Sequence, residues 1–415
     1  MKAGEIWVFH HYADPPDGHW TGTYDLYRHL GTRGNRVTVF SSSFSHYTRR
    51  DDRLTAKEKV SSRSYDGVDF VFVKTTPHIK NDWRRLANML TYTLRSHRAA
   101  NRHRGQPDVV VGSTPHPFCA LAGLVQARKH RVPFVLELHD LWLEYLKDTG
   151  AISVWNPVAL LWQALDRLLY EKANMIMALW PNMQARLAQL RIPEEKVVWM
   201  PMGVDFDDHV LPEPTQKDDG VPFLVMFTGS IGPASNLGEV VLAAKFLQER
   251  GQDHIRFVLI GAGPDRERLM KFAEEEGLRN LEFPGLVPKG EIASRLATAD
   301  ACICGLPDVP TYNEFGTIPT KLLDYMSSNR PTIFISNVKD SMVVLGKAGY
   351  AVPPEQPEAL VEVLLKLAAM PVEERARIGQ NGVDYLRENH DLRLLSERLG
   401  AILEGEIQKR NRPDS

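Results

Sequence analysis

Residues 316–335 read Gly-Thr-Ile-Pro-Thr-Lys-Leu-Leu-Asp-Tyr-Met-Ser-Ser-Asn-Arg-Pro-Thr-Ile-Phe-Ile and predict a loop, a short helix and a buried strand. Glycine in the loop lets a ligand approach the backbone closely. The free N–H groups of the helix's first turn form an anion site at the positive end of the helix dipole. Lys321 adds a positive charge there, and Asp324, one turn further on, is placed to accept hydrogen bonds from two ribose hydroxyls. A diphosphate beside a ribose is typical of a sugar nucleotide.

Outward from this stretch, short β-rich runs alternate with helical patterns along the whole chain. This alternation is typical of parallel sheets with helices on both faces, so it predicts an α/β protein. The clearest helix is expected over residues 157–170, with Asn156 as N-cap. Its buried apolar stripe is expected to comprise Val158, Leu161, Trp162, Leu165, Leu168 and Leu169. Strands are expected at residues 5–9, 36–41, 68–73, 108–112, 133–138, 174–179, 196–201, 223–228, 255–260, 280–284, 300–305 and 331–335.

The length of 415 residues suits two or three domains. A break near residues 203–222, where Pro212 and Pro214 precede a polar run, predicts a hinge between two Rossmann-like domains. The expected units are an N-terminal acceptor-side domain over 1–205, a donor-nucleotide domain over 206–385, and a C-terminal helix over 386–415 that crosses back to the first domain.

The composition is that of an ordinary globular protein, with 43% apolar and 25% charged residues. A formal net charge of −2 argues against a nucleic-acid partner, so any electropositive role has to be local. No stretch approaches the roughly 18 apolar residues of a membrane-spanning helix. The apolar run near the N-terminus is too short for a signal peptide. We expect a cytoplasmic protein that rests on the inner membrane face at most.

A glycine loop, Gly229-Ser-Ile-Gly232, lies between an expected strand and an expected helix. This order predicts a phosphate cradle, although no Gly-Lys-Ser/Thr ends it, which excludes a Walker A loop. With the loop before Lys321, two helix N-termini would meet at the carboxyl ends of parallel strands, where open α/β sheets bind ligands. Gly261-Ala-Gly-Pro-Asp-Arg266 resembles a dinucleotide fingerprint, but Arg266 occupies the third glycine position, so a tight strand-to-helix turn is favoured over an NAD site.

Polar residues leave the carboxyl ends of two expected strands in the first half. His139 and Asp140 follow the strand at 133–138. His139 is a candidate to donate a hydrogen bond to a reacting sugar, and Asp140 or Glu144 is a candidate to orient His139. A polar lining of a cleft without chemistry is the alternative interpretation. His10 and His11 follow the first strand at the same edge and are candidates to contact an acceptor.

No metal site is predicted. Asp205 and Asp207 have the spacing of a carboxylate pair for a divalent ion, but they lie in the expected hinge, so a solvated acidic linker is favoured. The 14 histidines show no zinc-like spacing with cysteine.

Residues 83–104 carry the clearest local concentration of charge. Attraction of the basic side to anionic lipid head groups is one interpretation, by charge rather than by insertion, and a solvated basic face is the other. The side expected to pack in the core carries Trp83, Leu86, Met89, Leu90 and Leu94, and the opposite side carries Arg84, Arg95, Arg98 and Arg102.

With these motifs the chain resembles a family-4 glycosyltransferase of the GT-B fold, which has two facing Rossmann-like domains. The resemblance covers most of the length. Within the family, the chain is most similar to fucosamine-transferase-like members, which act on amino-sugar donors in surface-polysaccharide assembly. It rests on residues 134–142 (Phe-Val-Leu-Glu-Leu-His-Asp-Leu-Trp), 201–205, 227–229, 257–264, 283–288, 299–300 and 316–331.

The resemblance implies a retaining transferase that moves a sugar from a nucleoside-diphosphate donor, with UDP and an N-acetyl amino sugar as the first choices. The implied acceptor is a glycan, a lipid-linked or a small molecule, and no cofactor is required. Asp324 would hold the ribose, His139 would contact the transferred sugar, and Lys321 would stabilise the leaving diphosphate. The implied catalytic residues are His139, Asp140 and Lys321, and the implied donor-binding residues are Gly229, Ser230, Ile231, Gly232, Gly285, Val287, Thr317, Pro319, Thr320, Lys321, Leu322 and Asp324.

The chain departs from the family pattern at two places. Many relatives carry a glutamate eight positions before the ribose-binding acid, where this chain has Gly316. The Arg and Lys that often follow the first glycine loop are also missing, and Lys321 is expected to replace their charge. Two alternatives stay open: a sugar-nucleotide 2-epimerase or hydrolase on the same fold, and a catalytically silent nucleotide-binding scaffold.

Overall fold

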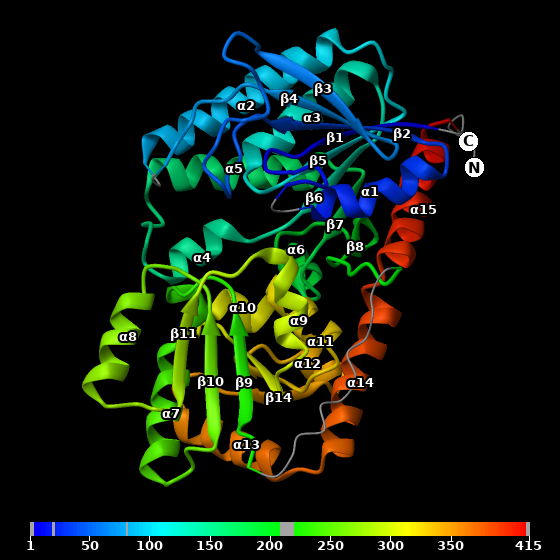
Figure 1. Ribbon diagram of the computed structural model, residues 1–415. Coiled ribbons are helices and arrows are strands. Elements are labelled where there is room, and N and C mark those ends of the chain that lie inside the picture. Colours follow the sequence, from blue (N-terminus) through cyan, green and yellow to red (C-terminus); the bar gives the residue numbers. More distant parts are fainter. Residues whose placement is uncertain (1–3, 19–20, 80–81, 208–219, 412–415) are drawn as a thin grey trace. The chain divides into compact units, whose positions relative to one another are not determined.

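The computed structural model describes residues 4–18, 21–79, 82–207 and 220–411. The chain divides into two compact units (Figure 1). The first unit comprises Met1–Asp205 together with Leu392–Ser415, and the second comprises Phe206–Asp391. Most of the predicted hinge, residues 208–219, lies outside the described residues.

The C-terminal segment is two helices rather than one. Helix α14 (Val372–Asn389) belongs to the second unit, and α15 (Leu392–Asn411) belongs to the first. The last domain boundary therefore falls six residues later than the sequence suggested, because α14 continues past residue 385 against α11 (Thr320–Ser327).

The first unit is built around an eight-stranded sheet in the order β3-β4-β2-β1-β5-β6-β7-β8. Every neighbouring pair is parallel except β3 and β4, which are antiparallel. Its strands are β1 (Glu5–Phe9), β2 (Arg36–Ser42), β3 (Val60–Tyr65), β4 (Val68–Val73), β5 (Val109–Ser113), β6 (Phe134–Leu138), β7 (Met175–Ala178) and β8 (Val197–Trp199).

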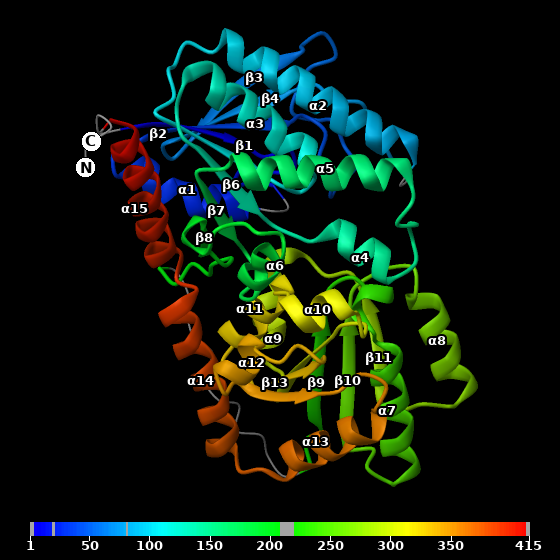
Figure 2. The ribbon, with the colours of Figure 1, turned by 180° about the vertical axis from the view of Figure 1, so that it is seen from behind.

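Helices cover both faces of this sheet because alternate strand residues point to opposite sides. Ile6 and Val8 of β1 lie in the core that α1 (Gly22–Thr32) and α15 complete. The other face is covered by α2 (Trp83–Arg102), α3 (Pro117–His130) and α5 (Pro157–Lys172), and α3 packs against both α2 and α5 (Figure 2). Two shorter helices are α4 (Trp142–Asp148) and α6 (Met183–Gln189).

Two of these helices expose apolar stripes that the sequence predicted to be buried. The N-cap of α5 is confirmed, since the Asn156 side chain accepts the Val158 N–H, but Val158 and Leu161 are 49% and 54% exposed. Of the five apolar residues predicted to bury α2, Met89 alone is buried. The prediction was wrong for α2, which buries other residues, among them Tyr92. It was partly right for α5, because Leu169 of the predicted stripe is buried and Trp162, Leu165 and Leu168 are half-buried.

The second unit is built around a six-stranded, wholly parallel sheet in the order β11-β10-β9-β12-β13-β14. Its strands are β9 (Phe223–Thr228), β10 (Ile255–Ile260), β11 (Leu281–Gly285), β12 (Ala301–Gly305), β13 (Thr332–Ile335) and β14 (Gly349–Val352). Its remaining helices are α7 (Gly238–Glu249), α8 (Arg266–Glu275), α9 (Ile292–Leu296), α10 (Pro310–Phe315), α12 (Met342–Leu345) and α13 (Pro357–Ala369).

Residues of α7, α8 and α13 form one core with the strands of the second sheet, and α11 lies against β12 and β13. Within the described ranges, no helix combines the length and the apolar content that a bilayer crossing requires. Two parallel-sheet α/β units with helices on both faces confirm the predicted fold class, and the strand β3 is its one antiparallel member.

Candidate nucleotide-binding site

The loops that follow β9, β10 and β11 stack on one another through their backbones. The Gly229 N–H donates to the Ile260 carbonyl, and the Gly261 N–H donates to the Gly285 carbonyl at 2.9 Å. Gly261 has no room for a side chain, because a Cβ there would lie 1.8 Å from the Gly229 oxygen. The Gly261 loop is thus a tight turn that supports the Gly229 loop, as the sequence favoured.

Along the Gly229 loop, every second backbone N–H group is used in this stacking. The N–H groups of Gly229 and Ile231 donate to the β10 side of the stack. Those of Ser230 and Gly232 have no acceptor among the described residues. Ser230 is exposed and Gly232 is half-buried, so both N–H groups are accessible and this loop offers donors to a ligand.

The N-terminus of α11 offers a second set of amides. The N–H groups of Thr317, Ile318, Thr320 and Lys321 also lack an acceptor within the described residues, and Pro319 has no N–H to satisfy. These groups lie at the positive end of the α11 dipole, where an anion is favoured by roughly 0.3–1 kcal/mol at an exposed site.

Lys321 joins the two sets. A Cβ at Gly229 would lie 3.0 Å from the Lys321 Cε and 3.7 Å from its Nζ, so the lysine side chain crosses directly beside the Gly229 backbone. The ammonium also lies 5.2 Å from the centroid of the Phe227 ring, in a cation–π contact. The two segments that the sequence singled out therefore meet at the carboxyl edge of the second sheet.

Tyr325, which the sequence analysis did not identify, ties α11 to the end of β9. Its hydroxyl accepts the Thr228 N–H at 2.7 Å and donates to the Thr228 carbonyl at 3.0 Å. Burial raises the pKa of this phenol well above 10, so it stays a donor at all physiological pH values. Because Thr228 directly precedes Gly229, Tyr325 is a positioning residue for the loop and for Lys321.

Replacing Tyr325 with Phe is expected to destabilise the second unit by about 1–3 kcal/mol, because the buried Thr228 N–H and carbonyl lose their partner. UDP affinity should fall by about three- to tenfold as the loop loses its anchor. Tyr350→Phe is the matched control, since the hydroxyl of the half-buried Tyr350 has no hydrogen-bond partner in the described part of the chain. Urea unfolding and calorimetric titration of both variants test this, and equal behaviour of the two would rule out the role.

Asp324 and the turn predicted to border the base lie at the same edge. Asp324 is exposed and follows Lys321 by three residues on α11, so the two share a face. Gly285 ends β11 with a φ of 88°, and Val287 after it is half-buried. The Arg266 guanidinium donates to the Phe283 carbonyl at 2.9 Å, which places a positive charge beside this turn.

Gly316 holds a conformation that excludes the glutamate found at this position in many relatives. Its φ of 80° and ψ of 173° lie in a region that is essentially restricted to glycine. The neighbouring carboxylate, Glu314, is exposed on α10. The departure from the family pattern at position 316 therefore involves the backbone conformation as well as the identity of the side chain.

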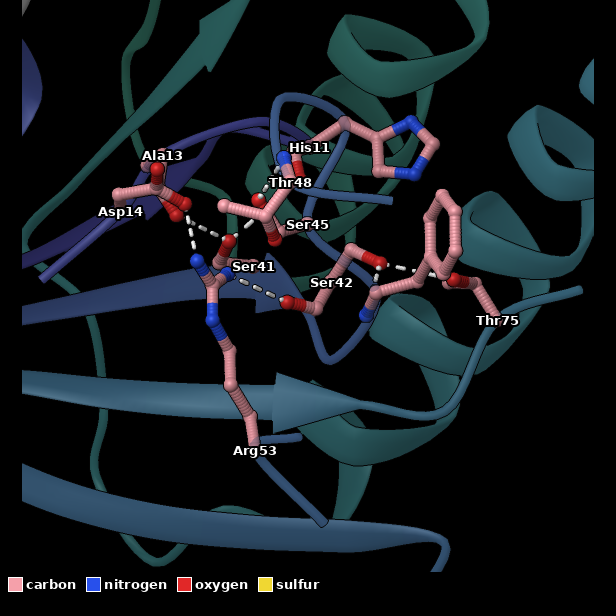
Figure 3. Close-up of polar contacts among 10 residues, drawn as sticks. His11, Ala13, Asp14, Ser41, Ser42, Ser45, Thr48, Arg53 and Thr75 are labelled. Carbon is pink, nitrogen blue, oxygen red and sulfur yellow. Dashed lines mark hydrogen bonds and ion pairs between the residues drawn. The ribbon is translucent and has the colours of Figure 1, made fainter. Parts of the chain in front are cut away.

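Polar contacts also gather at the carboxyl edge of the first sheet (Figure 3). Arg53 forms an ion pair with Asp14 and donates to the Ser42 carbonyl at 2.9 Å. The Ser41 hydroxyl donates to the Ala13 carbonyl at 2.6 Å. These bonds fix the loop after β1. His10 and His11 are only 2% and 1% exposed, so they line the interior of this edge rather than its surface.

His139 is paired with Glu137, a second residue that the sequence analysis did not assign. The His139 Nε2 lies 3.3 Å from the Glu137 Oε2, which also accepts the Ser113 hydroxyl. Burial would raise the pKa of Glu137, but His139, His10 and Ser113 together lower it to about 2. Burial would lower the pKa of His139, but the Glu137 charge raises it above 6.5. The Glu137 carboxylate thus favours the protonated form of His139, and Asp140 beside it is exposed.

His10, Glu137 and His139 bring potential metal-ligating atoms within 4.8 Å of one another. Two imidazoles and a carboxylate suit a divalent metal ion. A metal would need the neutral imidazole of His139, however, and the ion pair with Glu137 favours the protonated one. The expectation of no metal stays a prediction.

Comparison with known proteins bears directly on these two units. Residues 16–208 match the model of Glycosyltransferase Family 4, and residues 212–384 match that of Glycosyl transferases group 1. The chain belongs to the family 4 glycosyltransferases. This glycosyltransferase is 23% identical over 239 residues to WcaL of Escherichia coli K12, provisionally described as a colanic acid biosynthesis glycosyltransferase. That match covers 57% of this chain and 58% of WcaL, so the chain spans less than two thirds of that relative.

Solved structures of the same fold cover nearly the whole glycosyltransferase. Sucrose-phosphate synthase from Thermosynechococcus elongatus superposes with a TM-score of 0.74 at 14% identity, over 98% of this chain and 100% of that one. HepE of Anabaena, in complex with UDP and glucose, superposes with a TM-score of 0.67 at 14% identity, over 97% of this chain and 99% of that one. The GT-B fold predicted for the glycosyltransferase is confirmed.

Proposed function

We propose that this glycosyltransferase binds a nucleoside-diphosphate sugar, with UDP as the nucleotide, at the carboxyl edge of its second sheet. The observation that carries the proposal is the position of Lys321 beside Gly229, between two sets of amides that lack acceptors. A diphosphate has the charge and the acceptor oxygens that such a group of donors requires. The UDP bound to HepE supports the choice of nucleotide.

Asp324 would accept hydrogen bonds from the ribose hydroxyls, one helical turn from the diphosphate. The turn at Gly285 and Val287 would border the base. Lys321 and the α11 N-terminus would stabilise the charge that develops on the leaving diphosphate, an electrostatic contribution that grows toward the transition state. An amino sugar as the transferred group stays a prediction.

The first unit would supply the acceptor side. His139 would donate its proton in a hydrogen bond to the reacting sugar, and Glu137 would keep it protonated and oriented. We further propose transfer with retention of anomeric configuration to a glycan or lipid-linked acceptor. The surface-polysaccharide role provisionally given to WcaL supports such an acceptor.

The Lys321→Ala substitution tests the donor site. The variant should bind UDP at least about tenfold more weakly, because a charge-assisted contact to phosphate is worth about 1.5–3 kcal/mol. Lys271→Ala is the matched control, since Lys271 is exposed on α8 and pairs with Glu275. Calorimetry on both variants, with GDP and ADP as competing nucleotides, measures the difference. Equal UDP affinity in both variants would refute the site.

Thermal unfolding with UDP, GDP, ADP and their sugars identifies the nucleotide independently. A ligand at 100 times its dissociation constant stabilises the folded state by about 2.7 kcal/mol. Free sugar or an epimer released without acceptor would indicate a hydrolase or epimerase. UDP binding without turnover on any acceptor would indicate a silent scaffold, an outcome that Gly316 favours because the usual glutamate is absent.

A further inference from the structure

Imidazole, phenol and guanidinium groups gather at the carboxyl edge of the first sheet, and the proposed transfer does not use them. They come from the segments that follow four neighbouring strands, β4, β2, β1 and β5. The chain passes to opposite faces of the sheet after β1 and after β5, which makes this the switch point where open α/β sheets bind ligands. We call the group the histidine–arginine cluster, and its members are His11, Tyr12, His46, Arg49, His78, Arg85 and His116.

Four rings in and beside the cluster stack on one another from the core toward the surface. The His11 ring stacks on Tyr92 with centroids 4.2 Å apart and on Tyr12 at 4.5 Å. Tyr12 in turn stacks on His46 at 4.5 Å. Tyr92 is fully buried, whereas His46 is half-buried. The cluster is therefore accessible from outside at His46.

Arg49 is held in this cluster by imidazoles instead of carboxylates. Its Nη1 lies 2.7 Å from the His78 Nε2 and 3.4 Å from the His46 Nδ1. A guanidinium only donates hydrogen bonds, so both imidazole nitrogens accept. Within the described residues Arg49 has no ion pair, and its Nε and Nη2 have no acceptor. A half-buried cation without a carboxylate partner favours an anionic ligand.

His11 holds a buried N–H group that lacks an acceptor. Burial lowers the pKa of His11 and of His116, so both rings are neutral. The His116 Nδ1 accepts the Cys119 N–H at 3.2 Å, which places the His116 proton on Nε2. That proton is donated to the His11 Nδ1, 2.6 Å away, so His11 carries its own proton on Nε2. The His11 Nε2 has no partner among the described residues.

His78 holds a second N–H group of this kind. Burial lowers the pKa of His78 to about 4, and the Arg49 charge contributes to the lowering, so this ring is neutral as well. Because its Nε2 accepts from Arg49, the proton is on Nδ1, which also has no partner in the described part of the chain. Buried donors rarely stay unpaired in a native protein. The unpaired groups at Arg49, His11 and His78 are all donors, which is the complement of an anion.

The cluster is also held in an unfavourable state. Arg49 has a φ of 58°, in the left-handed region that disfavours a residue with a Cβ. Burial lowers the pKa of Arg49, and the charge of Arg85 lowers it further, so two cations lie close enough to repel each other. Backbone strain of this kind gathers at functional sites. An anion between the two guanidinium groups would offset their repulsion.

We propose that the histidine–arginine cluster binds an oxyanion, a phosphate or a carboxylate group, that the acceptor carries. This inference rests on the proposed function, in which the first unit takes the acceptor, and it narrows that acceptor to an acidic molecule. Arg49 and Arg85 supply the charge. The N–H groups of His78 and His11 supply directed hydrogen bonds.

Calorimetric titration of the full chain with methyl phosphate and with glucuronate tests the binding and separates the two sources of the oxyanion. UDP is present at saturation, so the amides of the second unit are already occupied. One or both anions should bind with a dissociation constant of about 1 mM or lower, and methyl glucoside, which is neutral, should not bind. Tighter binding of methyl phosphate assigns the site to a phosphate, and tighter binding of glucuronate assigns it to a carboxylate.

Arg49→Gly separates a ligand-binding role from a structural one. The variant should bind the preferred anion at least about tenfold more weakly, because a charge-assisted contact is lost. Arg50→Gly is the matched control, since Arg50 is the next residue of the same loop and is exposed. Arg49→Gly should unfold at a temperature no lower than Arg50→Gly does, because glycine adopts the φ of 58° without strain.

Nitrogen-15 NMR of the imidazoles locates the bound anion. The N–H signals of His11 and His78 should shift when the anion is added, whereas those of the exposed His254 in the second unit should not. The proposal is overturned if neither anion binds saturably up to about 50 mM, a concentration well above the expected dissociation constant. Equal anion affinity of Arg49→Gly and Arg50→Gly would overturn it too. UDP affinity should be the same in both variants, so the nucleotide site and the oxyanion site can each fail alone.

Discussion

Acidification from pH 7 to pH 5 is expected to remove about 4 kcal/mol of stability from the first unit through His10 and His116 alone. Both side chains are buried, at 2% and 1% exposure, and burial lowers the pKa of each to about 3 from the ordinary 6.5. A loss of this size is a large fraction of the 5–15 kcal/mol typical of a domain.

The direction follows from where the protons bind. As the pH falls through 6.5, the unfolded chain protonates these histidines, while the folded chain keeps them neutral down to about pH 3. Their stabilising contribution is thus complete above pH 6.5 and is lost as the pH falls, at about 1.4 kcal/mol per pH unit for each. His11 acts in the same direction, since burial also lowers its pKa and its Nδ1 lies 2.6 Å from the His116 Nε2.

The geometry of the His11–His116 pair supports the lowered pKa of both histidines. Two imidazole nitrogens 2.6 Å apart can share a hydrogen bond only if one of them lacks a proton. His116 also caps α3, where its Nδ1 accepts the Cys119 N–H. Protonation would therefore remove one acceptor from the pair and another from the helix cap.

Urea unfolding between pH 5 and pH 7, followed by tryptophan fluorescence, measures the effect. All eight tryptophans lie within residues 1–205, so the signal reports on the first unit. His116→Asn keeps a capping side chain and should reduce the pH slope by about 1.4 kcal/mol per pH unit. His254→Gln, at an exposed position of the second unit, should leave it unchanged. Stability that is flat between pH 5 and pH 7 would contradict this account.

Gly261→Ala is expected to cost the second unit about 3 kcal/mol or more and to weaken UDP binding at least about tenfold. The added Cβ would lie 1.8 Å from the Gly229 oxygen, and the φ of 148° disfavours any L side chain. The loop after β10 cannot move away without breaking the bond from the Gly261 N–H to the Gly285 carbonyl. The clash therefore displaces the Gly229 loop, which supplies the proposed phosphate donors.

Gly277→Ala separates steric clash from backbone strain. Gly277 also has a positive φ, 61°, but a Cβ there would meet nothing within 4 Å. Its replacement should cost only about 1 kcal/mol and leave UDP affinity unchanged. Circular dichroism during urea unfolding and calorimetric titration compare the two variants. Similar midpoints and similar affinities would show that the loops do not depend on each other.

The strand pattern was predictable almost completely from the sequence. All twelve expected strands are present, because a run of β-branched and aromatic residues is buried on both faces of a parallel sheet. Two strands were missed, β3 and β14, which lie at sheet edges. Val60–Tyr65 is polar and mostly exposed, and Gly349–Val352 is only four residues long, so neither shows the apolar signal.

The candidate site was predictable where it depends on local chain geometry. Glycine at 229 and the helix start before Lys321 are visible in the sequence because turns and helix N-termini have their own residue preferences. Tyr325 and Glu137 were not identified. Tyr325 acts through Thr228, which is distant in sequence, and no short-range pattern records such a contact. Glu137 pairs with His139 only two residues away, but it also accepts the hydroxyl of Ser113 on the neighbouring strand, which no local pattern records.

The sequence by itself thus determined the order of strands and helices, the two-domain α/β architecture and the donor-rich loops of the second half. Only the tertiary structure decided which apolar stripes are buried. The periodicity of α2 and α5 predicts a stripe but does not say whether it meets the sheet or water, and Leu94 and Leu161 proved to be exposed. The physical reason is that amphipathic spacing is a property of one helix, whereas burial is a property of the neighbours that pack against it.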